Sequence, residues 1–427
     1  MNSGTLLVNA AIPITWPIRH ADQPLSPVLA VLPVLLGLAI VVGVALRTRH
    51  RSSRPPVSTG AWRRRVLAVL MAAVAVTAAG PVSGTAVVTA TAATAARSTA
   101  VIPASDRQVE FTVDGATTYG TVHIPAHLAG QKLAAALLLP GSGPTDRNGD
   151  QPPEIRPHTL ALLANALGDD GVMSLRFDKY GTGRTGYGRY KNSDSLDMTA
   201  YTDQAVAAYN ALRAQPEADS HKLIVVGHSE GGLQALLVDH AVRPKPAGLA
   251  LIAPQDTRLL NALGRQLADD LDRQVRAGEL WPGQAELNKE GLAQAIADFR
   301  AGRPVETSRL LPFIASFLTA ALGPHNAAFV RSDDVLYPPD IARGVVPGTR
   351  VLITCGTADT NVPCRTLTPL VAALAAAHTT GPGLRILPGL DHFLHPAGTP
   401  VNYQVIAPAA QRALSDFVRP WKPHPAP

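Results

Sequence analysis

The apolar residues of this chain follow two alternating patterns from residue 101 onward. Short apolar runs without polar alternation predict strands that are buried on both faces. These runs occupy residues 133–140, 172–178, 222–227, 247–254, 349–356 and 383–389. Stretches with apolar residues at helical spacing predict helices at residues 159–171, 197–215, 232–242, 366–378 and 402–420. Strands that alternate with helices predict an α/β fold, a mostly parallel sheet with helices on both faces.

Two parts of the body depart from this alternation. Residues 107–114 and 118–125 are separated by a glycine-containing turn and predict an antiparallel strand pair. Residues 257–330 contain helical stretches with no strand between them. We therefore expect a helical cap at about 257–330 that covers one end of the sheet, within a catalytic domain of residues 101–427.

The first hundred residues have a different composition. Residues 27–46 are twenty residues without a charge, about the length of a membrane-spanning helix. An arginine-rich stretch follows at 47–65, then a second apolar run at 66–82. Residues 83–100 are rich in alanine and threonine and have the composition of a flexible linker. We therefore separate residues 1–100, a membrane or export region with its linker, from the catalytic domain.

Two interpretations fit this N-terminal region. In one, residues 27–46 and 66–82 are transmembrane helices on either side of a cytoplasmic arginine loop. In the other, residues 62–80 are a signal peptide behind an unusual extension. A pair of buried core helices is a third reading, but it would place the arginine block inside a folded core. Both of the first two interpretations export the catalytic domain, so we expect it outside the cytoplasm, anchored to a membrane.

The net charge of +6 originates in the N-terminal region. Residues 1–65 hold eight arginines and one acidic residue, so the remaining residues carry a net charge of −1. A nearly neutral body lacks the basic face that binding to a phosphate backbone requires. We therefore expect no nucleic acid partner.

One serine stands between glycines directly after a predicted buried strand. The stretch Gly227-His228-Ser229-Glu230-Gly231 fits G-x-S-x-G, and a helix is predicted to follow it. A nucleophile elbow requires this context, because its sharp turn exposes the serine hydroxyl between a strand and a helix. An ordinary glycine-rich loop is the other interpretation. The context favours Ser229 as the catalytic nucleophile.

A serine hydroxyl needs a base within hydrogen-bond reach and a third group that orients this base. In an α/β sheet of this kind the acid and then the histidine follow the serine along the chain. Asp359 follows the predicted strand at 349–356, and His392 follows the one at 383–389. Both therefore emerge at the same edge of the sheet as Ser229. We predict Asp359 as the acid and His392 as the base.

Other residues compete for these roles. Asp256 follows the strand after the elbow and is the alternative acid, and His395 is the alternative base. Asp333 and Asp334 precede the penultimate strand and are expected to face the wrong way. His228 is expected to shape the turn and not to take part in catalysis.

Acyl transfer also requires donors for the oxyanion that develops on the carbonyl oxygen. The backbone N–H of Glu230, directly after the nucleophile, is one predicted donor. The other comes from the glycine-rich loop in residues 137–150, where we predict the N–H of Ser142. An ordinary glycine turn is the alternative interpretation of this loop.

Five motifs occur in a fixed order, namely PGSGPTDRNGD, LRFDKYGTGRT, VVGHSEGG, GTADTNVP and DHF. Together they resemble the serine esterases of the α/β-hydrolase superfamily, in the branch related to dienelactone hydrolases and prolyl-oligopeptidase catalytic domains. The resemblance spans roughly residues 105–420 and does not cover residues 1–100. It implies an α/β-hydrolase fold with Ser229, Asp359 and His392 as a catalytic triad.

The same resemblance concerns the glycine-rich loop. It implies that the loop from Gly141 to Gly143 forms part of the oxyanion hole. Asp146 and Arg147 match an Asp-Arg pair of that branch, which implies that they brace the loop. Tyr180 is a departure, because relatives commonly carry arginine there, and this leaves the role of the second loop open.

The implied activity is the hydrolysis of carboxylic esters through an acyl-enzyme, with a small-molecule ester as substrate. An exported peptidase or an acyltransferase stays open, since both use the same intermediate. A non-catalytic, membrane-anchored binding protein on the same fold is the alternative from another class. Residues 181–186 fit G-x-G-x-x-G, but a helix is predicted where a dinucleotide site needs a strand. No cluster has metal-ligand spacing, so we expect neither a cofactor nor a metal.

The only two cysteines, Cys355 and Cys364, enclose Asp359 in the sequence. In an exported protein this placement favours a disulfide, which would hold the loop of the acid. Two buried thiols are the alternative, because cysteine is among the most buried residue types.

Overall fold

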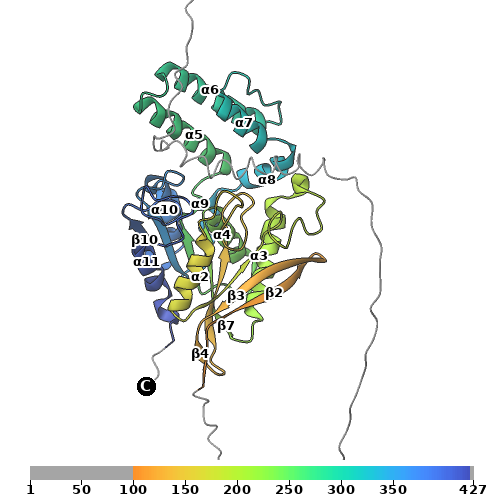
Figure 1. The fold of residues 1–427 in the computed structure, drawn as a ribbon, viewed down its shortest axis with the longest axis vertical. Coiled ribbons are helices and arrows are strands. Elements are labelled where there is room, and N and C mark those ends of the chain that lie inside the picture. The colour runs from red at the N-terminus through yellow and green to blue at the C-terminus, as the bar shows by residue number, and fades with distance from the viewer. Residues whose placement is uncertain (1–99, 424–427) are drawn as a thin grey trace, which may run out of the picture.

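The structure, a computed structural model, describes residues 100–423. Its centre is an eight-stranded sheet with the strand order β10-β9-β8-β7-β5-β6-β3-β2 (Figure 1). These strands are β2 (Ser105–Val113), β3 (Ala116–Ile124), β5 (Leu133–Leu139), β6 (Met173–Phe177), β7 (Ala218–His228), β8 (Gly248–Ile252), β9 (Arg350–Gly356) and β10 (Thr380–Leu387). The short strands β1 (Val101–Ile102) and β4 (His127–Leu128) form a separate antiparallel pair.

The sheet is mostly parallel. Each neighbouring pair from β6 through β5, β7, β8 and β9 to β10 is parallel. The strands β2 and β3 form an antiparallel hairpin that joins the sheet through β6. The predicted parallel sheet and the predicted antiparallel pair are therefore confirmed.

Helices cover both faces of this sheet. One face packs against α3 (Met198–Arg213), α4 (Glu230–Ala241) and α10 (Thr368–Ala376). The other face packs against α2 (Thr159–Asp169) and α11 (Pro408–Val418). Because the central strands are covered twice, both of their faces are apolar, which explains their unbroken apolar runs.

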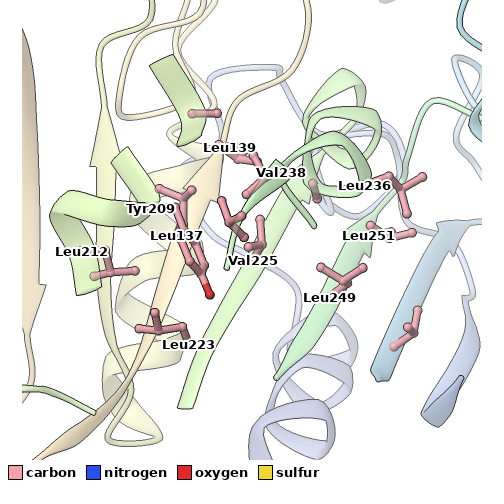
Figure 2. Close-up of a cluster of buried hydrophobic side chains, with 14 of the residues drawn as sticks. Leu137, Leu139, Tyr209, Leu212, Leu223, Val225, Leu236, Val238, Leu249 and Leu251 are labelled. Carbon is pink, nitrogen blue, oxygen red and sulfur yellow. The ribbon is translucent and has the colours of Figure 1, made fainter. Parts of the chain in front are cut away.

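Successive residues of β5 contribute to opposite cores. Leu137 and Leu139 belong to the core under α3, whereas Leu138 belongs to the core under α2. Figure 2 shows Tyr209 and Leu212 of α3 beside Leu137 in the first of these cores. Burying a leucine-sized side chain stabilises a protein by about 1.5–3 kcal/mol, so these two cores fix the positions of the strand ends.

The segment between β8 and β9 is entirely helical. It consists of α5 (Leu259–Arg276), α6 (Pro282–Arg300), α7 (Pro312–Ala321), α8 (Pro324–Asp334) and α9 (Pro338–Ala342). The helices α5 to α8 share an apolar core of their own, which also contains Leu233 of α4. Figure 1 shows α5, α6 and α7 together at one end of the molecule. We refer to α5 to α9 as the cap.

Two cap helices, α8 and α9, were not predicted from the sequence, and this corrects the placement of two acidic residues. Asp333 and Asp334 end α8 and do not lie on the approach to β9. Asp334 accepts hydrogen bonds from the Arg300 side chain at 2.8 and 2.9 Å. Asp333 accepts one from Nε2 of Gln255, in the loop after β8, at 2.8 Å. The expectation that Asp333 faces away from the site is wrong, because α8 folds back over the carboxyl ends of the strands.

The predicted N-terminal segments at 27–46 and 66–82, like the whole region 1–99, lie outside the described residues. Within residues 100–423, no single helix is long and apolar enough to cross a membrane. The bent pair of α7 and α8 meets the criterion by length and composition, and both helices belong to the cap.

Candidate active site

Ser229 lies on a strained turn between β7 and α4. Its backbone has φ 57° and ψ −123°, a left-handed φ that a side chain rarely adopts. The Ser229 N–H donates to the carbonyl oxygen of Ile252 at 2.9 Å, and the Ser229 carbonyl accepts from the N–H of Gly232 at 2.8 Å. Such strain persists where the surroundings hold it, and it is concentrated at functional sites. The turn places Ser229 at the carboxyl edge of the sheet, directly before the first turn of α4.

The two glycines around the turn are required because there is no room for a side chain at either position. A Cβ atom on Gly227 would lie 1.9 Å from the carbonyl oxygen of Gly231. A Cβ atom on Gly231 would lie 2.3 Å from the carbonyl oxygen of Leu139 in β5. Both clashes are with backbone atoms, so no side-chain rearrangement could relieve them.

His392 and Asp359 form a buried pair in the loops after β10 and β9. The distance between Nδ1 of His392 and Oδ2 of Asp359 is 2.8 Å. The second oxygen of Asp359, Oδ1, accepts the backbone N–H groups of Asn361 and Val362, each at 2.8 Å. Burial lowers the pKa of His392, but the charge of Asp359 and its hydrogen bond outweigh burial and raise it overall. The imidazole is thus held in one orientation, with Nε2 as the nitrogen free to exchange a proton.

Ser229 and His392 line two cavities together. The larger has a volume of about 760 Å³, including space open to solvent, and the smaller of about 390 Å³. The cap contributes an apolar wall to the larger cavity, made of Leu259, Leu263, Phe317, Leu322, Phe329 and Val330. Loop residues after β5 line the smaller cavity, among them Ser142, Thr145 and Gln151. A substrate carbonyl at Ser229 would therefore have one space lined by the cap and a second space lined by the loop after β5 beside it.

The competing acid and base have other partners. Asp256 forms a bidentate ion pair with Arg265 of α5, at 3.0 and 3.1 Å, and also lines the larger cavity. His395 is fully buried, and its ring nitrogens have no hydrogen-bond partner among the described residues. Its ring packs against Tyr403, with the centroids 5.7 Å apart. Neither residue is hydrogen-bonded to His392.

His228 holds the backbone of the histidine loop. Its Nε2 lies 2.9 Å from the carbonyl oxygen of His392, so Nε2–H is the donor. Burial and the neighbouring His392 lower the pKa of His228 to about 3. His228 therefore stays neutral at ordinary pH and keeps this hydrogen bond.

The glycine-rich loop after β5 approaches Ser229 closely. A Cβ atom on Gly141 would lie 3.1 Å from the Cβ of Ser229. The Ser142 carbonyl accepts hydrogen bonds from Oγ1 of Thr145 and Nε2 of Gln151, both at 2.8 Å. Gly143 adopts φ 75°, a left-handed conformation that favours glycine. The loop is therefore fixed from within and brings the peptide before Ser142 next to the serine.

The second predicted donor, the N–H of Glu230, is at the start of α4. The first N–H groups of a helix have no intrahelical acceptor, so this N–H is available to a ligand. The helix dipole also favours negative charge at this end. The structure thus brings Ser142 and Glu230, predicted from different strands, to the same nucleophile.

Asp146 and Arg147 support the loop through separate partners and not through each other. Oδ1 of Asp146 accepts the N–H groups of Asn148 and Asp150, at 2.8 and 3.1 Å. Arg147 forms a bidentate ion pair with Asp178 after β6, at 2.7 and 2.9 Å. The pair of Arg147 with Asp178 ties the loop after β5 to the loop after β6.

Three charged side chains near Ser229 were not predicted to form a cluster. Lys179 after β6, the Glu230 side chain and Asp333 of α8 are all buried. Nζ of Lys179 lies 3.8 Å from Oε1 of Glu230 and donates to the carbonyl oxygen of Gly141 at 2.7 Å. Lys179 and Glu230 stand in the motifs LRFDKYGTGRT and VVGHSEGG, but their meeting depends on the strand order β6-β5-β7, which the sequence does not state.

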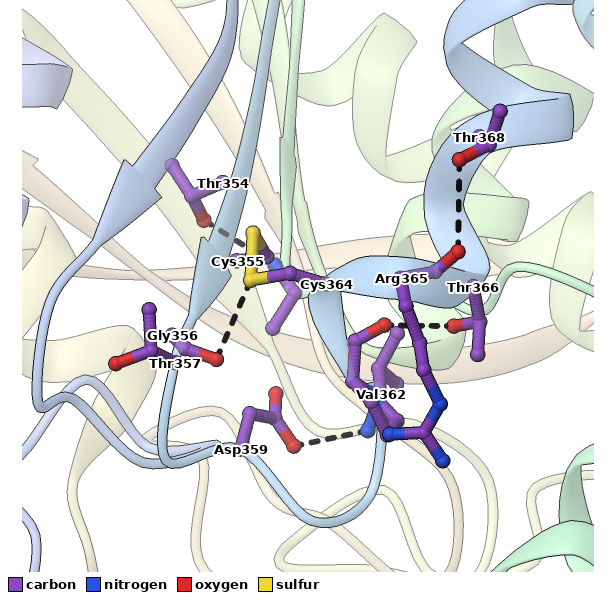
Figure 3. The surroundings of a disulfide bond; sticks show 12 residues. Thr354, Cys355, Gly356, Thr357, Asp359, Val362, Cys364, Arg365, Thr366 and Thr368 are labelled. Carbon is purple, nitrogen blue, oxygen red and sulfur yellow. Dashed lines mark hydrogen bonds between the residues drawn. A yellow bond between two sulfur atoms is a disulfide. The ribbon is translucent and has the colours of Figure 1, made fainter.

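The two cysteines are joined in a disulfide (Figure 3). Cys355 lies near the end of β9, and Cys364 begins the 3₁₀ helix Cys364–Leu367. Figure 3 shows Asp359 in the loop between them, with its hydrogen bond to the backbone of Val362. The disulfide closes the loop that carries the acid.

The described residues offer no metal centre. Within residues 100–423, no group of three or more histidine, cysteine or acidic side chains could hold a metal ion.

Residues 136–402 match the sequence profile of the alpha/beta hydrolase family. This match covers more than half of the chain, and the chain belongs to the alpha/beta hydrolase family. The predicted α/β-hydrolase fold is thereby confirmed, and membership supports hydrolysis as the class of reaction. The narrower branch inferred from the motifs stays a prediction. No curated protein is significantly similar to the chain in sequence.

Similar solved structures have low sequence identity to this chain. An esterase of Pyrococcus furiosus is 14% identical, with a TM-score of 0.48 over 75% of this chain and 92% of that one. Est1E of Butyrivibrio proteoclasticus is 14% identical, with a TM-score of 0.43 over 74% and 98%. A proline iminopeptidase of Mycobacterium smegmatis is 16% identical, with a TM-score of 0.45 over 74% and 98%. At this level of similarity they carry no argument about the substrate.

Proposed function

We propose that this protein is a serine hydrolase that cleaves carboxylic esters through an acyl-enzyme. Ser229 is the nucleophile, His392 the general base and Asp359 the residue that orients it. The observation that carries this proposal is the 2.8 Å hydrogen bond between His392 and Asp359, with His392 lining both of the cavities that Ser229 lines.

The chemistry follows from the proton positions. Oγ of Ser229 attacks the ester carbon while Nε2 of His392 takes its proton. The oxygen of the former carbonyl becomes negative, and the N–H groups of Ser142 and Glu230 stabilise it. Collapse releases the alcohol, which receives the proton from His392. A water molecule, deprotonated by His392, then attacks the acyl-enzyme and frees the acid and Ser229.

The apolar residues that the cap contributes to the larger cavity favour a substrate with an aliphatic acyl group. The wall of the larger cavity that the cap contributes is apolar, and it reaches Ser229. A chain of methylene groups gains roughly 0.8 kcal/mol for each one that leaves water, so this cavity favours straight-chain acyl groups over acetyl. The alcohol then leaves through the smaller cavity, beside the loop after β5.

A fluorophosphonate probe tests the nucleophile. We expect one labelled peptide, the one that contains Ser229, and we expect Ser229→Ala to lose both labelling and p-nitrophenyl butyrate hydrolysis. Ser195→Ala, which changes an exposed serine in the 3₁₀ helix Ser193–Ser195, is the matched control and should keep both. Undiminished hydrolysis by folded Ser229→Ala would refute the proposal, and so would label on another serine.

Two further measurements separate esterase from peptidase and acyltransferase activity. The p-nitrophenyl ester and the p-nitroanilide of one acyl group should differ strongly in kcat/KM in favour of the ester. When butanol is added, the acyl-enzyme should still transfer most of its acyl group to water and little to butanol. An anilide that is cleaved as efficiently as the ester would assign a peptidase, and a predominant butyl ester product would assign an acyltransferase.

A further inference from the structure

The peptide group between Gly141 and Ser142 is bonded to a buried cation on its far side. Nζ of Lys179 donates to the Gly141 carbonyl oxygen at 2.7 Å. In a trans peptide group the C=O and N–H bonds point in opposite directions within one plane. A cation that fixes the C=O of Gly141 therefore also fixes the direction of the Ser142 N–H. A Cβ atom on Gly141 would lie 3.1 Å from the Cβ of Ser229, so this plane stands directly beside the nucleophile.

The same ammonium group contacts the residue that supplies the other donor. Nζ of Lys179 lies 3.8 Å from Oε1 of Glu230, whose backbone N–H begins α4. Lys179 follows β6, Gly141 follows β5 and Ser229 follows β7. Since these three strands are neighbours in the sheet, one side chain bridges the two loops that hold the two N–H groups.

The side chains of the cluster are buried. The side chains of Lys179 and Glu230 are only 7% and 3% exposed. The Tyr201 ring centroid lies 5.3 Å from Nζ of Lys179. Asp333 of α8 interacts electrostatically with both charged groups and binds Gln255 at 2.8 Å. A buried cation is costly unless it is paired and hydrogen-bonded, so a lysine held here at the oxyanion loop needs a reason beyond filling space.

The three ionisable groups of this cluster shift one another's pKa values. Burial raises the pKa of Glu230, against the opposing effect of Lys179. Burial raises the pKa of Asp333 further, and the charge of Glu230 adds to this effect. Burial lowers the pKa of Lys179, and the charges of Glu230 and Asp333 oppose this effect. The 2.7 Å hydrogen bond from Nζ to the Gly141 carbonyl oxygen is the contact through which Lys179 acts on the loop.

We propose that Lys179 is a positioning residue for the oxyanion hole. Its ammonium group holds the Gly141 carbonyl and the Glu230 side chain, so that the N–H groups of Ser142 and Glu230 converge on the oxyanion. Hydrogen bonding at the carbonyl also polarises the peptide group and strengthens its N–H as a donor. This inference rests on the proposed esterase function and adds a residue that acts through the backbone.

Lys179→Met tests the inference, because methionine is an unbranched side chain only one atom shorter than lysine and has no charge. We expect kcat to fall about 10- to 100-fold with KM nearly unchanged, as for weakened oxyanion stabilisation. Lys179→Arg keeps a cationic donor and should recover part of kcat. Lys245→Met is the matched control, since Nζ of Lys245 lies 3.9 Å from Oδ2 of the buried Asp239 in α4, and Lys245 does not line either cavity at Ser229. It should leave kcat unchanged.

Two ketones separate positioning from a general structural effect. A trifluoromethyl ketone with the substrate's acyl chain binds as the tetrahedral adduct of Ser229, whereas the methyl ketone binds as an unreacted carbonyl. In Lys179→Met the inhibition constant of the trifluoromethyl ketone should rise by the factor by which kcat/KM falls. The inhibition constant of the methyl ketone should not change. Equal changes for both ketones, or an unchanged kcat, would overturn the inference.

Folding and the underlying function are controlled separately. If Lys179→Met does not fold, the double variant Lys179→Met/Glu230→Gln removes both charges of the pair and is measured in its place. It should show the same loss of kcat, and a normal kcat in it overturns the inference as well. Residual hydrolysis by Ser229→Ala would instead overturn the proposed function, so the two failures are distinguishable.

Discussion

His392 and Asp359 meet across 33 positions of the chain through a buried hydrogen bond of 2.8 Å between Nδ1 and Oδ2. The carboxylate is itself fixed, because its other oxygen accepts the N–H groups of Asn361 and Val362 within the same loop. The backbone after β9 thus fixes the Asp359 carboxylate, and this carboxylate orients the imidazole of His392.

The first prediction concerns this acid. Asp359→Asn should reduce kcat/KM about a thousandfold or more, because the amide does not stabilise the protonated imidazole and permits the wrong tautomer. Asp256→Asn, which breaks the ion pair with Arg265, should lose much less. Steady-state kinetics on one ester compares the two variants. A larger loss in Asp256→Asn would reassign the acid to Asp256.

The pH dependence gives an independent measurement of the same relationship. His392 must be neutral to act as a base, so activity is lost as pH falls through its pKa. Asp359 raises this pKa against burial, which lowers it. The acid limb of kcat/KM should therefore lie above the ordinary histidine range in the native protein and move to lower pH in Asp359→Asn. An acid limb that does not move would mean that another group controls it.

The second prediction separates the two histidines after β10. His392→Ala should be as inactive as Ser229→Ala. His395→Ala should retain most of kcat but lose roughly 1–3 kcal/mol of unfolding free energy, since it leaves a cavity beside Tyr403. Denaturant unfolding and ester kinetics on both variants check this prediction. The roles would be exchanged if His395→Ala were the inactive variant.

The positions of residues that directly follow a strand could be predicted from the sequence. Ser229, Asp359 and His392 each follow an apolar run, and the carboxyl ends of parallel strands share one edge, so their meeting could be expected. Lys179 and Asp333 could not be predicted in this way. The position of Lys179 depends on β5 lying between β6 and β7, which is a matter of strand order.

The cap was the least predictable part. The helix α9 has only 5 residues, and the 11 residues of α8, PHNAAFVRSDD, include few apolar side chains, so neither helix has an apolar periodicity that can be recognised. The position of Asp333 over the site depends on how α8 packs, and no local pattern encodes this. The closing helix was predicted at 402–420, whereas α11 begins at Pro408, where the apolar spacing becomes regular.

The third prediction concerns the acyl group. Leu263 of α5 lines the larger cavity, so Leu263→Trp should shorten the acyl chains that are accepted. We expect kcat/KM for octanoyl esters to fall about tenfold or more, and that for acetyl esters to change little. Leu267→Trp, one turn further along α5 in the same apolar core, is the control and should lower stability without changing the chain-length profile. A uniform loss for all chain lengths in Leu263→Trp would place the acyl group elsewhere.

The fourth prediction concerns the N-terminal region, residues 1–100. The full chain should sediment with membranes, and a chain that begins at residue 101 should not, because the apolar runs at 27–46 and 66–82 are then missing. Protease added to cells with an opened outer envelope and an intact inner membrane should cleave the catalytic domain. Complete protection of the domain would contradict export.

The last prediction concerns the disulfide around the acid. Cys355 and Cys364 are nine positions apart and enclose Asp359, so the bridge closes a short ring that restricts the unfolded chain. A ring of this size stabilises a fold by roughly 2–3 kcal/mol, and Cys364→Ser should lower the unfolding free energy by about this amount. Activity should also fall, and fall further on mild heating, because the loop that aims Asp359 at His392 is then less constrained. Mass spectrometry of the non-reduced native protein should find the crosslinked peptide. Two thiols that are alkylated without reductant would exclude the bridge, and normal heat resistance of activity in Cys364→Ser would show that the acid loop is held by its hydrogen bonds alone.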